Sequence, residues 1–364
     1  MLRNLLSTTC FVSSASFIAL SLGIASSSLA LSQTPTTGTS APQSQVVQEQ
    51  VVNVYTNREP SLFANTLTDF TQKTGIKVNT VFSDKGLAER IIAEGINSPA
   101  DLYITVDAGK LHEATEKNIA QPIISNLVDT IVPDDFHGEG NTWVSLSMRA
   151  RAIYASKERV NANALTYEML ADPQWKGRIC IRSGQHPYNI ALFATMLVKK
   201  GEVATKQWLT GLKANLARKP SGGDRDVAKD IAAGVCDIGL ANTYYIGLMQ
   251  TGANEDQKKW ASAVKVILPT FEGGGTHVNI SGVVLIKTAP NKANAVKLVE
   301  HMLASDTQKT FADANFEYPI RANITTNPII ASFGTLKPDA TNMIAIAKAR
   351  TRASQLVDEV GFDQ

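Results

Sequence analysis

Charged and aromatic residues are sparse in this 364-residue chain, and no run of Lys or Arg stands out. Charged residues make up 19% of the sequence, aromatic residues 7%, and the formal net charge is +2. A nucleic-acid-binding protein usually carries a basic face or stripe, and single-strand binders add aromatic stacking platforms. The sequence shows neither feature, so we predict no nucleic-acid partner.

Motifs of common enzyme classes are also missing. The sequence has no GxSxG, Walker or dinucleotide-binding motif, and its five histidines are scattered without a helical pair at metal-ligand spacing. The glycines at 273–275 lack the spacing of a nucleotide-binding loop. Ser183 and His186 lie close in sequence, which alone is weak evidence for a catalytic pair. We therefore predict that the protein is not an enzyme.

Only the N-terminus has a long apolar run. Residues 1–30 combine Arg3, an apolar stretch around 17–24 and small residues ending at Ala30, which predicts a signal peptide cleaved near Ala30. An uncleaved membrane anchor is the alternative, but serines within 21–28 make the stretch short and polar for a span. No second apolar stretch of about 18 residues follows. We therefore expect an exported protein.

The segment after the predicted signal peptide, residues 31–49, is rich in Ser, Thr, Gln and Pro. Such a composition cannot bury a core, so we predict a flexible linker. Of the three cysteines, Cys10 lies within the predicted signal peptide. The remaining Cys180 and Cys236 are the right number for a single disulfide in an oxidising compartment.

From residue 51 onward, β-rich runs alternate with amphipathic helical segments. This rhythm predicts an α/β fold with parallel strands and helices on both faces. The first unit has strands at 51–56, 76–83 and 101–106, a helix that ends at Gly75, and a helix at 87–95. The second unit, which begins near residue 150, has strands at 151–156, 177–183, 236–243 and 280–288, with helices at 189–200, 202–213, 224–233, 291–304 and within 338–358.

Two α/β units in one exported chain suggest two lobes around a cleft. Ligands of parallel sheets bind outside the carboxyl ends of the strands. The segments 56–59, 183–188 and 242–245 are therefore the expected lining of a binding site.

Three tyrosines stand at these positions. Tyr244 and Tyr245 follow the predicted strand 236–243, and Tyr188 follows the predicted strand 177–183. A phenol has an ordinary pKa of about 10, but a hard, highly charged cation can displace its proton. Three phenolates would cancel the charge of Fe(III), whereas soft metals prefer sulfur or imidazole. Alternatively, these tyrosines contact an organic ligand or belong to the core.

Arginines occur beside the same predicted cleft. Arg58 follows the first strand, and Arg149 and Arg151 alternate on one strand and should face the same side. An Arg in a cleft can bind an oxyanion with its planar fork, although a lone Arg more often forms a surface ion pair. Glu59 could be a metal ligand, a partner of Arg58, or a carboxylate favoured by the dipole of a helix.

At these residues the sequence resembles the periplasmic ferric-iron-binding proteins that supply ABC importers, and the cyanobacterial iron-uptake binding proteins. The resemblance extends from residue 51 to about residue 333. It is carried by VVNVYTNREP (51–60), TGIKV (74–78), SPADLYITVD (98–107), LADPQWKGRI (170–179), LANTYYIGL (240–248), GTHVNISGV (275–283) and FEYPIRANI (316–324). The Tyr–Tyr pair combined with the upstream Tyr188 is the most specific feature.

The resemblance implies a type II periplasmic binding-protein fold. The first lobe would comprise 50–149 and 276–324, and the second lobe 150–275 and 325–364. It also implies that Tyr188, Tyr244 and Tyr245 bind the metal as phenolates.

Two positions depart from the family pattern. Many members carry His where this chain has Glu59, and some carry Glu where it has Val106. The Arg58–Pro60 segment is similar to a subgroup that uses three tyrosines and a carbonate-like anion, held at the positions of Arg58 and Arg149.

The resemblance thus predicts a protein, expected to be monomeric, that captures Fe(III) in the periplasm and delivers it to an ABC importer permease. The alternatives are binding of another small solute (an oxyanion, a thiamine-like cation or a polyamine) or, less favoured, an exported enzyme.

Overall fold

The computed structural model describes residues 50–59 and 62–364. The predicted signal peptide and linker lie outside the described residues, as does Pro60 of the resembling segment. These described residues form one compact unit. The strands are β1 (Val51–Thr56), β2 (Lys77–Phe82), β3 (Leu102–Thr105), β4 (Ala120–Gln121), β5 (Val144–Ser156), β6 (Ile179–Cys180), β7 (Ile238–Asn242), β8 (Val264–Ile267), β9 (Val278–Ile286) and β10 (Tyr318–Pro319).

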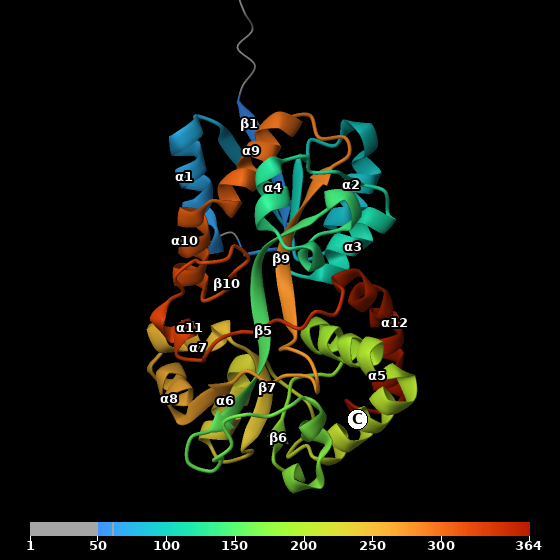
Figure 1. Cartoon of the computed structure of the whole chain (residues 1–364), viewed down its shortest axis with the longest axis vertical. Coiled ribbons are helices and arrows are strands. Elements are labelled where there is room, and N and C mark those ends of the chain that lie inside the picture. Colours follow the sequence, from blue (N-terminus) through green and yellow to red (C-terminus); the bar gives the residue numbers. More distant parts are fainter. Residues whose placement is uncertain (1–49, 60–61) are drawn as a thin grey trace, which may run out of the picture. The chain divides into compact units, whose positions relative to one another are not determined.

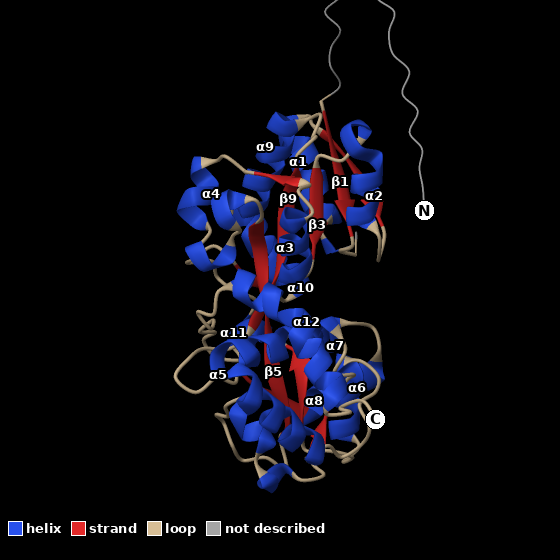
Figure 2. Ribbon diagram, turned by 90° about the vertical axis from the view of Figure 1, so that its right-hand side faces the viewer, coloured by secondary structure: helices blue, strands red, loops and turns tan. Residues whose placement is uncertain are grey.

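Helices flank these strands (Figure 2). They are α1 (Ala64–Thr74), α2 (Leu87–Glu94), α3 (Ala108–Glu116), α4 (Asn126–Ile131), α5 (Pro187–Ala214), α6 (Asp224–Ala232), α7 (Tyr244–Thr251), α8 (Glu255–Ala263), α9 (Lys292–Leu303), α10 (Ser305–Asn315), α11 (Pro328–Ala331) and α12 (Met343–Glu359). Within residues 50–59 and 62–364, none of the helices has both the length and the hydrophobicity of a membrane span.

The strands form one sheet in the order β2-β1-β3-β9-β5-β7-β6, to which β4, β8 and β10 add further pairings. Strand β1 is parallel to both of its neighbours, β2 and β3. This confirms the parallel arrangement predicted for the first unit. The two strands in the middle of the order, β9 and β5, are antiparallel to each other and lie side by side in Figure 1.

Strand β5 changes partners near its middle. From Val144 to Ala150 it pairs with β9, and from Arg151 to Ser156 it pairs with β7 and β8. The prediction that this strand begins at residue 151 is wrong, because the seven preceding residues continue it. No Gly or Pro interrupts residues 144–156, so nothing in the sequence ends the strand there. The lobe boundary near residue 150 stays a prediction.

Glycines set the ends of several helices. Gly75 follows α1 with a φ of 72°, a left-handed conformation that Gly adopts without strain. Gly201, with a φ of 77°, interrupts α5 and so separates the two helices predicted at 189–200 and 202–213. The strand predicted at 177–183 is shorter, because the carbonyls of Arg182 and Ser183 accept hydrogen bonds from the side chain of Asn189.

The predicted disulfide is confirmed. Cys180 lies on β6, Cys236 lies two residues before the parallel neighbour β7, and their Cα atoms are 5.9 Å apart. Both side chains are buried with Val227 and Ile231 of α6.

Replacing Cys180 and Cys236 together by Ser is expected to lower the free energy of unfolding by about 4 kcal/mol, because the bridge closes a long loop in the unfolded chain. Chemical denaturation of the mature protein without reductant measures this difference. Added reductant should destabilise the wild type and leave the double variant unchanged. Equal stability of the two proteins without reductant would contradict the prediction.

Candidate metal site

The three predicted tyrosines lie at the starts of two helices. Tyr188 is in the first turn of α5, which begins with Pro187, a residue favoured there because its φ is already helical. Strand β7 ends at Asn242, and Tyr244 and Tyr245 are the first two residues of α7. The connection between β7 and α7 is therefore a single residue, and it brings both tyrosines to the carboxyl end of the strand.

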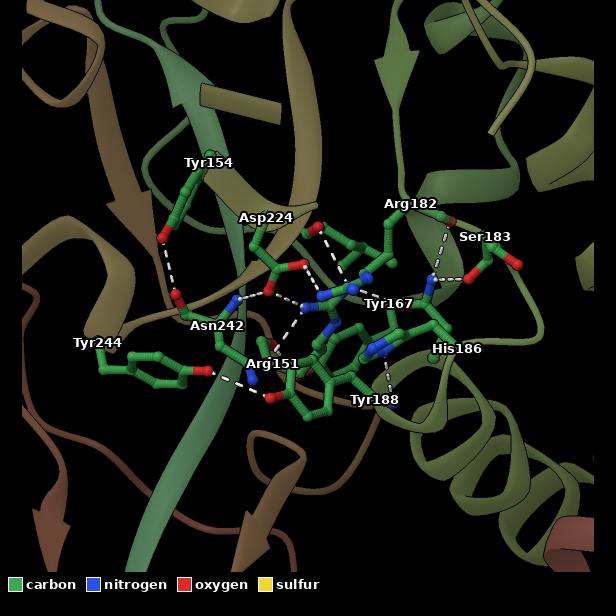
Figure 3. A network of polar contacts seen from close by, with 12 residues as sticks. Arg151, Tyr154, Tyr167, Arg182, Ser183, His186, Tyr188, Asp224, Asn242 and Tyr244 are labelled. Carbon is green, nitrogen blue, oxygen red and sulfur yellow. Dashed lines mark hydrogen bonds and ion pairs between the residues drawn. The ribbon is translucent and has the colours of Figure 1, made fainter. Parts of the chain in front are cut away.

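The structure brings the three aromatic rings together. The hydroxyl oxygens of Tyr188 and Tyr244 are 3.3 Å apart (Figure 3). The ring centres of Tyr244 and Tyr245 are 4.2 Å apart. Two of the three predicted ligands thus share one hydrogen bond, and the third, Tyr245, packs against Tyr244.

A pocket of about 200 Å³ opens beside Tyr188 and Tyr244. Its lining residues are Asn57, Arg58, Glu59, Leu62, Val106, Arg149, Tyr188, Tyr244, Leu248, Asn315 and Glu317. Both arginines that the sequence suggested for an anion are among them, together with Glu59. Tyr245 is not among the lining residues, and its ring lies against that of Tyr244.

Burial determines how the phenols titrate. Burial raises the pKa of Tyr244 well above its ordinary value, and the neighbouring Tyr188 and Tyr245 raise it further. Burial also raises the pKa of Tyr245. Both phenols are therefore neutral near pH 7 in the absence of a cation. A metal ion that binds them must displace their protons.

Arg58 is buried, with 4% of its surface exposed, and contacts a carboxylate that the sequence analysis did not identify. Its Nη2 lies 3.1 Å from Oε2 of Glu317, and its Nη1 donates to Oγ of Ser281 at 2.6 Å. Although burial raises the pKa of Glu317, the charges of Arg58 and Arg149 and a hydrogen bond from Ser147 lower it below the ordinary value. Glu317 is therefore ionised, and it compensates the charge of Arg58.

Arg149 contacts main-chain groups instead. Its Nη2 donates to the carbonyl oxygen of Val106 and, at 2.8 Å, to that of Ile280. Among the described residues, the buried Nε atoms of Arg149 and Arg58 have no hydrogen-bond partner. The pocket is thus bordered by two arginines that each retain an unpaired donor.

Arg151 belongs to a buried network next to the tyrosines (Figure 3). Its Nη1 lies 2.6 Å from Oδ2 of Asp224, and Nη1 of Arg182 lies 3.2 Å from the other oxygen of that carboxylate. The guanidinium carbons of Arg151 and Arg182 lie 6.0 Å and 5.3 Å from the ring centre of Tyr188. Arg149 lines the pocket together with Tyr188, so Arg149 and Arg151 lie on the same side of β5, as strand alternation predicted.

A third guanidinium group lies beside the tyrosines. The guanidinium carbon of Arg225, in the first turn of α6, is 4.8 Å from the ring centre of Tyr245. Arg151, Arg182 and Arg225 thus surround the tyrosines, whereas Asp224 is the carboxylate that pairs with two of them. This local excess of positive charge favours phenolates, or an anion, at the tyrosines.

Sequence reasoning missed Glu317 and Asp224. Both lie in segments it had marked, since Glu317 falls within 316–324 and Asp224 begins the helix predicted at 224–233. No local pattern indicated that these carboxylates would meet Arg58 and Arg151.

The remaining candidate groups make other contacts. Oγ of Ser183 donates to Oδ2 of Asp363 at 2.6 Å, and Nδ1 of His186 accepts from the main-chain N–H of Tyr188 at 3.2 Å. Ser183 and His186 are thus each bonded elsewhere. In the part of the chain that the structure describes, no cluster of three or more His, Cys, Asp or Glu side chains could hold a metal ion.

Comparison with known proteins gives the family. Residues 97–332 match the model of a family described as bacterial extracellular solute-binding protein. The iron uptake protein A1 of Synechocystis is 40% identical over 317 residues, which is 86% of this chain and 88% of that protein.

Solved structures agree with this match. A ferric-binding protein from Bordetella is 51% identical with a TM-score of 0.83, covering 86% of this chain and 100% of that one. A Trichodesmium protein in complex with iron and citrate is 39% identical with a TM-score of 0.82, covering 86% of this chain and 99% of that one. The predicted α/β periplasmic binding-protein fold is therefore confirmed. The family consists of solute-binding proteins, which confirms that the chain is not an enzyme. The chain belongs to the bacterial extracellular solute-binding protein family, among its periplasmic ferric-iron-binding members.

Proposed function

We propose that this protein is exported to the periplasm, captures Fe(III) there with the phenolates of Tyr188, Tyr244 and Tyr245, and delivers it as a monomer to the permease of an ABC importer. The observation that carries this proposal is the 3.3 Å separation between the hydroxyls of Tyr188 and Tyr244 at the edge of a pocket. Relatives named for iron uptake and for ferric binding support it.

The chemistry of the pocket favours a hard, highly charged cation. Three phenolates would neutralise Fe(III), and the guanidinium groups near Tyr188 and Tyr245 would stabilise those phenolates. Tyr245, whose ring centre lies 4.2 Å from that of Tyr244, would supply the third phenolate.

The other solutes considered fit this arrangement less well. A polyamine or a thiamine-like cation would meet guanidinium groups beside neutral phenols, which is electrostatically unfavourable. An oxyanion bound without a metal would be attracted by the guanidinium groups, but it would not explain why three phenols lie together. A coloured ferric complex separates these cases.

The test is a visible spectrum of the purified mature protein before and after chelated ferric iron is added. We expect an orange to purple charge-transfer band from phenolate to Fe(III). Because each bound phenol loses a proton, the band should weaken as the pH falls. A protein that stays colourless with a stoichiometric ferric supply would overturn the proposal.

We further propose that an oxyanion completes the iron coordination, held by Arg149 and Arg58. Fe(III) has room for more than three ligands, and Val106 cannot coordinate through its side chain. Arg58 and Arg149 both line the pocket, and their planar guanidinium groups can bind an oxyanion such as carbonate. Because Glu317 already compensates the charge of Arg58, only the charge of Arg149 remains to be neutralised. A singly charged anion such as bicarbonate or one carboxylate group would neutralise it. The citrate in the Trichodesmium complex supplies carboxylates.

Replacing Arg149 by Met should weaken ferric binding by about 10–100-fold, since a hydrogen bond to a charged group contributes about 1.5–3 kcal/mol. Iron affinity of the wild type should also rise when bicarbonate or citrate is added to anion-free buffer. Arg178→Met, at a partly exposed ion pair with Asp237, is the control and should bind iron normally. Anion-independent binding, together with loss of binding in Glu59→Gln, would instead make Glu59 the ligand.

A further inference from the structure

The turn that leads into α5, residues 183–186, is held by the residues that follow α12. Helix α12 lies beside α5 (Figure 1), and Phe362 and Asp363 come shortly after its end. A Cβ atom on Gly184 would lie only 2.7 Å from Cδ1 of Phe362, which is fully buried. The ring of Phe362 thus packs directly against the bare backbone of the 183–186 turn.

Asp363 accepts three hydrogen bonds from the same turn. Its Oδ2 accepts from Oγ of Ser183 at 2.6 Å and from the main-chain N–H of Gln185 at 3.2 Å. Its Oδ1 accepts from the main-chain N–H of Gly184 at 2.7 Å. Hydrogen bonds to a carboxylate are roughly twice as strong as those between neutral groups. One carboxylate therefore fixes three consecutive residues.

The turn is also bonded to the network at the tyrosines. Nδ2 of Asn189, the residue after Tyr188, donates to the carbonyl oxygens of Arg182 and Ser183 at 3.1 Å and 3.0 Å. Oδ1 of Asn189 accepts from Nη2 of Arg151 at 2.7 Å. The 183–186 turn therefore connects the residues after α12 with the side chains around the candidate metal site.

Tyr188 depends on this turn because it lies in the first turn of α5. The first N–H groups of a helix have no partner within the helix, so a helix start frays unless the preceding residues hold it. The main-chain N–H of Tyr188 donates to Nδ1 of His186, and the N–H of His186 donates to the carbonyl of Ser183 at 3.1 Å. The 3.3 Å separation between the hydroxyls of Tyr188 and Tyr244 thus depends on the turn.

We propose that Asp363 is a positioning residue for the candidate metal site. Its carboxylate holds the 183–186 turn and so keeps the hydroxyl of Tyr188 beside that of Tyr244 for a shared metal ion. Asp363 is not among the residues that line the pocket, so it acts through Tyr188. The inference rests on the proposed function, in which Tyr188 is a ligand of Fe(III).

The position of Tyr188 can be measured without iron. In the mature protein with carbon-13 in its tyrosine rings, the NMR signal that is missing from Tyr188→Phe identifies Tyr188. We expect this signal to shift or broaden in Asp363→Ala, because the turn loses three hydrogen bonds. The signal of Tyr154, identified in the same way, should stay in place, since its hydroxyl donates to the carbonyl of Asn242.

Iron affinity is the second measurement. Asp363→Ala should weaken ferric binding about tenfold, the lower end of the loss caused by removing groups that orient metal ligands. Asp363→Asn, which keeps one acceptor oxygen, should lose less. Glu359→Ala is the matched control, because it also removes a carboxylate at the end of α12, but one that pairs with Arg352 and Lys206. It should keep the wild-type iron affinity and the wild-type signal of Tyr188. Chemical denaturation verifies that each variant is folded.

Three results would overturn the inference. The first is an unchanged signal of Tyr188 in both Asp363 variants. The second is an equal change of that signal in Glu359→Ala. The third is wild-type iron affinity in Asp363→Ala although the signal of Tyr188 has moved. A wild-type protein that binds no iron would instead overturn the proposed function, and the signal of Tyr188 would still show whether Asp363 holds this side chain in place.

Discussion

Replacing Tyr244 by Phe is expected to bleach or shift the ferric charge-transfer band and to weaken iron binding by more than about a hundredfold. The estimate is a lower bound, because the loss of groups that merely orient metal ligands already costs about 10–100-fold. Tyr188→Phe should have an effect of similar size, since its hydroxyl is 3.3 Å from that of Tyr244. Visible titration with chelated ferric iron, analysed against the chelator's own affinity, measures both.

The control is Tyr154→Phe, which removes a buried hydroxyl close to the site without removing a ligand. It should retain the wild-type spectrum. The third tyrosine gives the sharpest outcome, because Tyr245 does not line the pocket. If Tyr245→Phe keeps the wild-type band while the other two variants change it, two tyrosines bind the iron instead of three. If all three variants keep the wild-type spectrum, the tyrosine site is wrong.

The second large effect concerns stability. Asp224→Ala is expected to lower the free energy of unfolding by about 3–5 kcal/mol, because it leaves the guanidinium of Arg151 buried without its partner. The two side chains are 0% and 2% exposed, and their contact distance is 2.6 Å. Asp224 also accepts from the main-chain N–H of Asn242 at 2.8 Å, so the end of β7 loses a contact too. Chemical denaturation of the iron-free protein measures the loss.

Asp237→Ala is the matched control. Asp237 also contacts two arginines, Arg159 and Arg178, at 2.5 Å and 2.6 Å, but those arginines are 36% and 40% exposed. Solvent therefore screens these pairs, and we expect a loss of no more than about 1 kcal/mol for each. Asp224→Asn, which keeps the shape, should lie between the two. Equal losses for Asp224→Ala and Asp237→Ala would show that burial of the ion pair does not determine its contribution.

Local sequence patterns determined much of the fold. Alternation and helical periodicity predicted β1, β2, β3 and the helices between them, because the spacing of apolar residues in a strand or helix can be read from a few consecutive residues. Gly75 and Gly201 marked helix ends, since a left-handed backbone favours Gly locally. The disulfide followed from cysteine number and compartment.

The location of the three tyrosines was also predicted from the sequence, because they follow predicted strands. Tyr188, Tyr244 and Tyr245 were expected at the carboxyl ends of strands, where ligands of such sheets bind, and they are found together there. Their grouping depends on the adjacency of β6 and β7, which the sequence did not predict.

Only the tertiary structure decided which groups surround those tyrosines. Glu317 meets Arg58 across 259 residues, and Asp224 meets Arg151 across 73 residues. Such contacts leave no periodic signal, because they are formed when distant strands and helices pack, and any nearby Arg or Glu would have fitted the local pattern equally well.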